Sequence, residues 1–209
     1  MSGRRAREQL AASDPAMAEL IERLGPCSLA RRRRGVEKPD AYGALLRAIV
    51  GQQLSTKAAA TIHGRVLDLF DGLPPSPERL LEVPEDELRA CGLSGRKVSY
   101  VRDLAVHVID GELELDRLEE LSDEEVIAEI VAVRGLGRWS AEMFLIFHLE
   151  RPDVFSGGDL GLRRGIQLAH ALEAMPTPTE AAEIAERWSP HRSLAAIYLW
   201  ESLAANPAD

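Results

Sequence analysis

Cysteines, long apolar runs and strand-like alternation are all scarce in this sequence. The 209 residues include two cysteines, Cys27 and Cys91, too few for a disulfide framework or a four-cysteine iron–sulfur cluster. No apolar run approaches the length of a membrane span, and no N-terminal signal pattern precedes a cleavage site. The five histidines show no metal-ligand spacing. These absences predict a cytoplasmic protein without an iron–sulfur cofactor.

An excess of basic charge is lacking as well. The net charge is −9, which taken alone argues against a nucleic-acid partner. However, residues 78–129 contain 16 acidic residues against 6 basic ones, so the rest of the chain is about neutral. That remainder includes the run Arg31–Arg34, which is typical of a solvated loop and whose role the sequence leaves open. An enzyme that must leave its product can bind DNA through few phosphate contacts, so DNA is not excluded.

What the sequence does have is helical periodicity along almost its whole length. The expected helices are 40–53, 55–70, a short one beginning at 84–87 and stopped by Gly92, 94–109, one capped by Ser122 and Glu125 ahead of 126–133, 140–149, 160–172, 178–188 and 191–204. The proline-rich segment 73–77 interrupts the pattern, and no repeat of 20–50 residues is evident. The sequence therefore predicts an all-α fold with two helical lobes flanking a cleft. We expect residues 1–38 to form a helical, basic segment packed on a core of residues 39–209.

The most informative segment is Val133–Ala141, which lies between two of the expected helices. Gly135 and Gly137 bracket Leu136, and glycine tolerates the positive φ of a very tight turn. Such a turn exposes backbone N–H groups at the start of the next helix, where the helix dipole also favours a phosphate. We expect Leu136 to fill the core below the turn and Ser140 to cap the helix. An ordinary helix–helix corner is the alternative.

Four ordered motifs resemble the helix-hairpin-helix DNA glycosylase superfamily. They are Gly51–Ser55, the hairpin Val133–Ala141, the loop Asp153–Gly165, and Trp188–Ser193 leading to Trp200. The resemblance runs from about Asp40 to Trp200 and implies a helix-hairpin-helix DNA-binding motif. It also implies that Asp159, in the Gly-rich loop beyond the hairpin, is the catalytic carboxylate. Asp159 also suits the N-cap of the helix that follows. A proline is common in the family where Ser156 stands, so a more flexible loop is expected.

Trp139 decides which branch of the superfamily this chain resembles. In bifunctional members a lysine at this position attacks the sugar, and an indole cannot do so. The branches with an iron–sulfur cluster are excluded by the cysteine count. What remains resembles the 3-methyladenine branch of the AlkA type, in a compact form without the N-terminal β domain. The resemblance implies a base pocket that we assign to Trp139, Trp200, Met143, Leu160 and Gln52. Family members have aromatic residues at the positions of Met143 and Leu160, so the range of lesions stays open.

The implied activity is hydrolysis of the N-glycosidic bond of alkylated purines, with 3-methyladenine and 7-methylguanine as substrates and an abasic site as product. The implied partner is double-stranded DNA containing damaged bases, bound by a monomer in the cytoplasm at the nucleoid. We assign DNA contacts to Gln53, Leu54, Ser55, Gly135, Leu136, Gly137, Arg138 and Ser140. Gln53 and Leu54 are wedge candidates for the vacated base stack, with a buried Leu54 as the alternative. The resemblance also suggests a sodium or potassium ion on the carbonyls of Val131, Val133 and Leu136.

Three other functions stay open at this point. The first is a non-catalytic helix-hairpin-helix DNA-binding protein, which would not need Asp159. The second is a glycosylase for etheno, deaminated, oxidised or mismatched bases on the same scaffold. The third is a helical adaptor for other proteins, in which the hairpin is only a turn.

Overall fold

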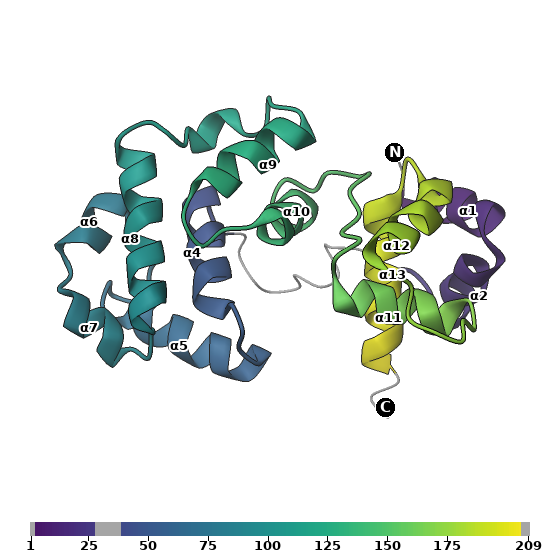
Figure 1. Cartoon of the computed structure of the whole chain (residues 1–209), viewed down its shortest axis with the longest axis horizontal. Coiled ribbons are helices and arrows are strands. Elements are labelled where there is room, and N and C mark those ends of the chain that lie inside the picture. Colours follow the sequence, from purple (N-terminus) through teal and green to yellow (C-terminus); the bar gives the residue numbers. More distant parts are fainter. Residues whose placement is uncertain (1–2, 28–38, 206–209) are drawn as a thin grey trace. The chain divides into compact units, whose positions relative to one another are not determined.

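The computed structural model describes residues 3–27 and 39–205, and within these ranges it contains helices and no strand (Figure 1). The all-α prediction is confirmed. The chain divides into two compact units, one formed by Met1–Glu37 with Leu145–Asp209 and the other by Lys38–Phe144. The expected division into a segment of residues 1–38 and a core of residues 39–209 stays a prediction. No helix in the described ranges is long and apolar enough to cross a membrane. The run Arg31–Arg34 lies outside the described residues.

The Lys38–Phe144 unit is built around two central helices. Its elements are α4 (Ala41–Gly51), α5 (Thr56–Asp68), α6 (Pro77–Glu82), α7 (Glu85–Ala90), α8 (Gly95–Ile109), the 3₁₀ turn η1 (Leu115–Arg117), α9 (Asp123–Ala132) and the greater part of α10 (Arg138–Phe147). Helix α4 packs against α5 and α8, and α6 and α7 also pack on α8 (Figure 1). Leu45 and Ile49 of α4 and Val101 and Leu104 of α8 are completely or almost completely buried, as the helical spacing of their apolar residues predicts.

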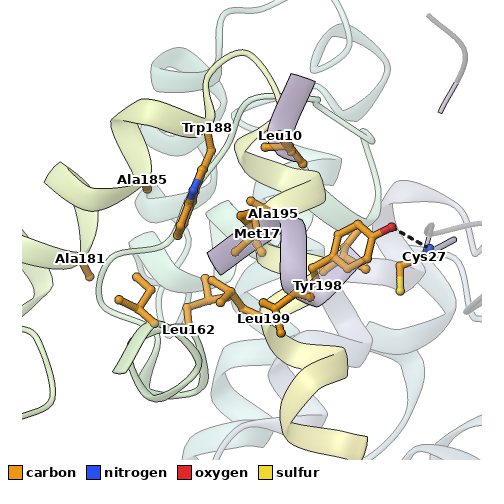
Figure 2. Packing of buried hydrophobic residues seen from close by; sticks show 14 residues of the cluster. Leu10, Met17, Cys27, Leu162, Ala181, Ala185, Trp188, Ala195, Tyr198 and Leu199 are labelled. Atoms are coloured by element: carbon orange, nitrogen blue, oxygen red, sulfur yellow. Dashed lines mark hydrogen bonds between the residues drawn. The ribbon is translucent and has the colours of Figure 1, made fainter. Parts of the chain in front are cut away.

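The other unit joins the two ends of the described chain. Its elements are α1 (Gly3–Ser13), α2 (Pro15–Leu24), the end of α10, α11 (Leu160–Ala169), α12 (Pro178–Ala185), the 3₁₀ turn η2 (Glu186–Trp188) and α13 (Arg192–Ala205). Helix α13 packs against both α11 and α2. Figure 2 shows Leu10 and Met17 of the N-terminal helices beside Ala195 and Trp188, all of them buried. The N-terminal helices therefore complete this core.

Buried polar contacts fix the N-terminal helices in this core. The Trp188 indole Nε1–H donates to Asp14 Oδ2 at 2.8 Å, and Asp14 also caps α2 by accepting the Ala16 N–H. The Tyr198 hydroxyl donates to the Gly25 carbonyl at 2.9 Å and accepts the Cys27 N–H at 3.3 Å (Figure 2). Buried polar groups are stable only when they are paired, so these contacts define a single arrangement of α1 and α2 on α13.

Local capping signals place most helix boundaries correctly. Ser122 and Glu125 form the expected capping box at the start of α9, and Ser94 caps α8. Helix α6 is not among the expected helices, because the prolines of segment 73–77 interrupt the pattern. Its start is nevertheless typical, since Ser76 accepts the Arg79 N–H and Pro77 stands at the first helical position, where a missing N–H costs nothing.

Candidate active site

The hairpin between α9 and α10 requires glycine at one of its two glycine positions. Gly135 has φ = +91°, and a Cβ there would lie 2.3 Å from the Cγ and Cδ2 atoms of Tyr100. Gly137 has no left-handed φ, and a Cβ on it would meet nothing within 4 Å. The expectation that both glycines serve a positive φ is therefore wrong for Gly137. Leu136 is 4% exposed and fills the core below the turn, as predicted.

Helix α10 begins two residues earlier than expected. The Ala141 N–H donates to the Gly137 carbonyl at 3.1 Å, so Gly137 is the N-cap residue and the helix starts at Arg138. Ser140 lies inside the first turn, is 5% exposed and is not the cap. The N–H groups of the first turn precede the first hydrogen bond within the helix and point out of its end. Open space at Gly137 leaves this end accessible to an anion.

Helix α8 and the turn after α4 hold the hairpin in place. Asp103 of α8 accepts the Arg134 N–H at 2.8 Å, and the Tyr100 ring packs against Gly135. The Gln52 side chain donates from Nε2 to the Gly135 carbonyl at 2.7 Å. The sequence assigned Gln52 to the base pocket, whereas in the structure its amide joins the α4–α5 turn to the hairpin. The two segments assigned to DNA contact are thus linked directly.

Arg138, expected to contact DNA, forms ion pairs with two carboxylates. Its guanidinium donates to both oxygens of Glu124 at 2.6 and 3.1 Å, and its Nε donates to Glu142 at 3.1 Å. These bonds, with Glu124 the largest contributor, raise the pKa of Arg138 above its ordinary value. Because Glu124 lies in the first turn of α9, the arginine ties the two hairpin helices together.

The turn between α4 and α5 presents the two wedge candidates. Gln53 has φ = +57°, a left-handed conformation that costs a non-glycine residue about 1–3 kcal/mol and is concentrated at functional sites. Leu54 is 37% exposed, so the alternative of a core leucine is wrong. Ser55 caps α5. Lys97 of α8 supports the same turn by donating from Nζ to the Val50 carbonyl at 2.7 Å.

Asp159 stands at the N-terminus of α11 and is held by two donors. Its Oδ1 accepts the Leu162 N–H at 2.8 Å, which makes it the N-cap, and also accepts the Trp200 indole Nε1–H at 3.1 Å. The two roles considered for this residue, helix cap and active-site carboxylate, are compatible with this geometry. Ser156 is completely buried and its carbonyl accepts the Asp159 N–H at 3.1 Å. The greater flexibility expected of this loop stays a prediction.

One glycine and an ion pair fix the loop that carries Asp159. A Cβ on Gly157 would lie 2.6 Å from the Pro178 carbonyl oxygen, so only glycine fits against the start of α12. At the beginning of the loop, Asp153 accepts hydrogen bonds from the Arg192 guanidinium at 2.9 and 3.1 Å and from the Ser189 hydroxyl at 2.8 Å. Burial acts to raise the pKa of Asp153, but these bonds outweigh it and hold the pKa below its ordinary value.

Comparisons with known proteins agree with this assembly of motifs. Residues 46–191 match the model of the HhH-GPD superfamily base excision DNA repair proteins. The chain belongs to this superfamily. It is 37% identical over 174 residues to DNA-3-methyladenine glycosylase 1 of Schizosaccharomyces pombe, covering 82% of this chain and 76% of that protein. It is 29% identical to DNA-3-methyladenine glycosylase 2 of Escherichia coli, covering 82% of this chain and 62% of that protein.

Two solved structures extend the HhH-GPD likeness over nearly the whole chain. The 3-methyladenine DNA glycosylase of S. pombe in complex with abasic DNA superposes with a TM-score of 0.87 at 33% identity, covering 98% of this chain and 99% of that one. A DNA-3-methyladenine glycosidase from Bacillus halodurans superposes with a TM-score of 0.83 at 35% identity, covering 96% of this chain and 91% of that one. The resemblance inferred from the four motifs is therefore confirmed.

The remaining residues of the expected HhH-GPD base pocket are distributed over both units. Trp139 is 49% exposed, so it is not a core residue, and it lies one helical turn before Met143 on the same face of α10. Leu160 is 66% exposed beside Asp159, and Trp200 stacks on Phe147 with ring centroids 5.3 Å apart. Because the pocket would need residues of both units, its assignment stays a prediction.

The expected cation site also stays a prediction. The carbonyl of Val133 accepts the Leu136 N–H at 3.1 Å, and a carbonyl oxygen has a second lone pair for a further partner. Among the described residues no cluster of three or more His, Cys, Asp or Glu side chains is arranged to hold a metal ion.

Sequence reasoning missed the residues that support this HhH-GPD site. Tyr100 and Asp103 act on a hairpin more than 30 positions away, and nothing in the local pattern of α8 marks them. Gly161 carried a usable signal, since glycine is unfavourable inside a helix unless close packing requires it. A Cβ there would lie 3.1 Å from Asp159 Oδ1 and 3.2 Å from Trp200 Nε1.

Proposed function

We propose that this protein is a monofunctional DNA glycosylase of base excision repair that removes alkylated purines, 3-methyladenine and 7-methylguanine among them. Its membership of the superfamily of base excision DNA repair proteins and its likeness to relatives named DNA-3-methyladenine glycosylase support the proposal. The single observation that carries it is the Asp159 carboxylate, fixed at the N-terminus of α11 by Leu162 and Trp200.

The chemistry of an alkylated purine suits one well-placed carboxylate. Alkylation gives the base a positive charge in the nucleoside, so the base leaves as a neutral molecule and needs no strong general acid. Positive charge then develops on the sugar, which becomes oxocarbenium-like. A carboxylate held rigidly in advance stabilises that charge without reorganising during the reaction. Asp159 supplies this carboxylate and also orients the attacking water.

Water is the nucleophile in this proposal because of Trp139. The position at which bifunctional superfamily members carry a lysine lies in the first turn of α10, and here an indole occupies it. An indole forms no Schiff base with the sugar. The product is accordingly an intact strand with an abasic site.

Double-stranded DNA is the partner that the hairpin suits. The open N-terminus of α10 would bind a phosphate, a contact that positions the duplex without reading its sequence. Gln53 and Leu54 would fill the gap left when the damaged base turns out of the duplex. The exposed face of Trp139 would bind a cationic purine through a cation–π interaction, which contributes about 1–2 kcal/mol to the binding free energy.

A base-release assay tests the proposal. Purified protein is incubated with duplex DNA containing methylated, etheno, deaminated or 8-oxoguanine bases, and free bases are separated by chromatography. We expect release of the methylated purines, no strand cleavage and no covalent product with borohydride. Asp159→Asn keeps an amide oxygen for the N-cap, so it should fold and bind abasic DNA but lose activity by about 10²–10³-fold. Absence of any released base, or a wild-type rate for Asp159→Asn, would refute the assignment.

Three features accompany this proposal. A sodium or potassium ion on the carbonyls of Val131, Val133 and Leu136 would neutralise the approaching phosphate. The second feature is a monomeric state, which suits an enzyme that searches DNA alone, and the third is a location at the nucleoid in the cytoplasm. Binding to abasic DNA with and without monovalent cations tests the cation site. The mass of the purified protein in solution tests the monomeric state.

A further inference from the structure

Trp200 contacts the proposed catalytic carboxylate through its indole N–H as well as presenting an aromatic ring. Asp159 Oδ1 accepts both the Trp200 Nε1–H at 3.1 Å and the Leu162 N–H at 2.8 Å. Capping of α11 requires only the second bond. Phe147 stacks on the Trp200 ring at an interplanar angle of 29°, which fixes the plane of the indole and the direction of its N–H. The three side chains thus form an ordered chain of contacts that ends on one carboxylate oxygen.

Gly161 lets the indole and the carboxylate approach without the displacement of a few tenths of an ångström that a Cβ would cause. A Cβ at this position would lie 3.1 Å from Asp159 Oδ1 and 3.2 Å from both Cδ1 and Nε1 of Trp200, closer than ordinary van der Waals contact. Its φ is not in the left-handed region, so the backbone does not require glycine. Room for the indole at Asp159 is what this glycine provides.

We propose that Trp200 is a positioning residue for the glycosylase reaction, and that Gly161 is the residue that lets its indole N–H reach Asp159. The inference rests on the proposed function, in which the Asp159 carboxylate stabilises the positive charge developing on the sugar. Two donors on the same oxygen fix the rotation of the carboxylate, so its charge stays in one place during the reaction. A charged hydrogen bond of this kind acts on the chemical step for every substrate base alike.

Nuclear magnetic resonance of the full chain tests the contact without any activity. The protein has three tryptophans, so its indole N–H groups give three signals, which single Trp→Phe variants assign. We expect the Trp200 signal to move in Asp159→Ser, in which a preferred N-cap residue remains but is too short to reach the indole. It should also move in Gly161→Ala. The matched control is Gly158→Ala, because a Cβ at Gly158 meets nothing within 4 Å; there the Trp200 signal should stay.

The Trp188 indole reports on the fold in the same spectra, because it donates to Asp14 in the core of the same unit. The Trp188 signal should be unchanged in Asp159→Ser, Gly161→Ala and Gly158→Ala. An unmoved Trp200 signal in Asp159→Ser would overturn the contact. Should the Trp188 signal move in Gly161→Ala, that variant has disturbed the core, and Trp200→Phe then tests the proposal through its activity.

Single-turnover kinetics test the consequence. Trp200→Phe keeps an aromatic ring against Phe147 but loses the N–H, so its rate of base release should fall by about tenfold to a hundredfold. Its affinity for abasic DNA should stay unchanged, and the fall should be equal for 3-methyladenine and 7-methylguanine. Gly161→Ala should lose rate as well, whereas Gly158→Ala should not.

Unequal losses for the two bases would show that Trp200 acts by stacking on the base, and a wild-type rate in Gly161→Ala would likewise overturn the positioning role. Failure of the wild-type protein to release any base would instead refute the proposed function. The indole signals would still measure the contact in that case, so the two failures are distinguishable.

Discussion

Replacing Gly135 by alanine should disrupt the hairpin, whereas the same change at Gly137 should leave the fold intact. Gly135 combines φ = +91° with a ring that would lie 2.3 Å from an added Cβ. Gly137 has neither constraint. The two positions are two residues apart in one turn and lose the same hydrogen atom, so they form a matched pair.

The magnitude follows from two separate costs at Gly135. Alanine in a left-handed conformation is unfavourable by about 1–2 kcal/mol. Moving the half-buried Tyr100 ring away from the new methyl group adds about 1–3 kcal/mol, the usual range for overpacking. The expected loss of about 2–5 kcal/mol is a large part of the stability of a typical domain. Gly137→Ala should lower the free energy of unfolding by no more than about 1 kcal/mol, which is the usual difference between glycine and alanine as N-cap residues.

Urea denaturation of the single and double variants separates the two costs. Combining Tyr100→Ala with Gly135→Ala should remove the steric part, which gives a coupling energy of about 1–3 kcal/mol between the two sites. Binding to abasic duplex should weaken in Gly137→Ala although its stability falls only slightly, because the methyl group would occupy the open end of α10. Equal destabilisation by the two glycine substitutions would refute this reasoning.

Three further perturbations follow from single contacts. The pKa of Asp153 is lowered in the folded state. Its hydrogen bonds therefore stabilise the protein at pH values above the unfolded pKa of about 3.9. This stabilisation is lost as the pH falls through the lower pKa of the folded state. Asp153→Asn should therefore lose stability at pH 7, and urea midpoints should show the difference from wild type shrinking below about pH 4. Gln52→Leu should lower the free energy of unfolding by about 1 kcal/mol and should speed amide hydrogen exchange in the hairpin. Unchanged hydrogen exchange would contradict the link between the two turns. Glu124→Gln should remove one of the two ion pairs of Arg138, leaving the one to Glu142, so that the arginine can turn toward a phosphate. DNA binding should strengthen, and the slope of its dependence on salt should increase by up to about one released counterion. An identical slope would show that the Glu124 ion pair does not restrain the arginine.

The sequence predicts those parts of the fold and site that depend on neighbouring residues. Ser122 and Glu125 mark the start of α9 three positions apart, and the capping box forms as expected. The hairpin is recognisable because two glycines and Leu136 stand between two apolar helices. Asp159 is recognisable as an N-cap residue from its place before the next helix, whereas its catalytic role is implied only by the family resemblance. In each case the physical cause acts within a few residues, so the pattern and the structure coincide.

The parts that could not be predicted depend on contacts distant in sequence. Trp200 reaches Asp159 across 41 positions, and Arg138 reaches Glu124 across 14, so neither pairing is visible in a local pattern. The start of α10 differs from the expected one because serine is a common cap residue, whereas the cap here is Gly137 and not Ser140. Segment 73–77 predicts a break because proline usually ends a helix, although Pro77 begins one.

The ion pairs of Arg138 explain how an acidic chain can be suited to DNA. The guanidinium in the first turn of α10 is held by Glu124 and Glu142, so in this structure its charge is balanced before any phosphate arrives. What the hairpin then offers a phosphate is the end of the helix itself, namely backbone N–H groups and the helix dipole, which involve no net charge. A contact of this kind does not depend on the total charge of −9. It also releases the DNA more readily than an array of lysines and arginines would, because its strength does not accumulate with each additional cation. The acidic composition that first argued against a DNA partner is therefore consistent with a hairpin that binds through its backbone.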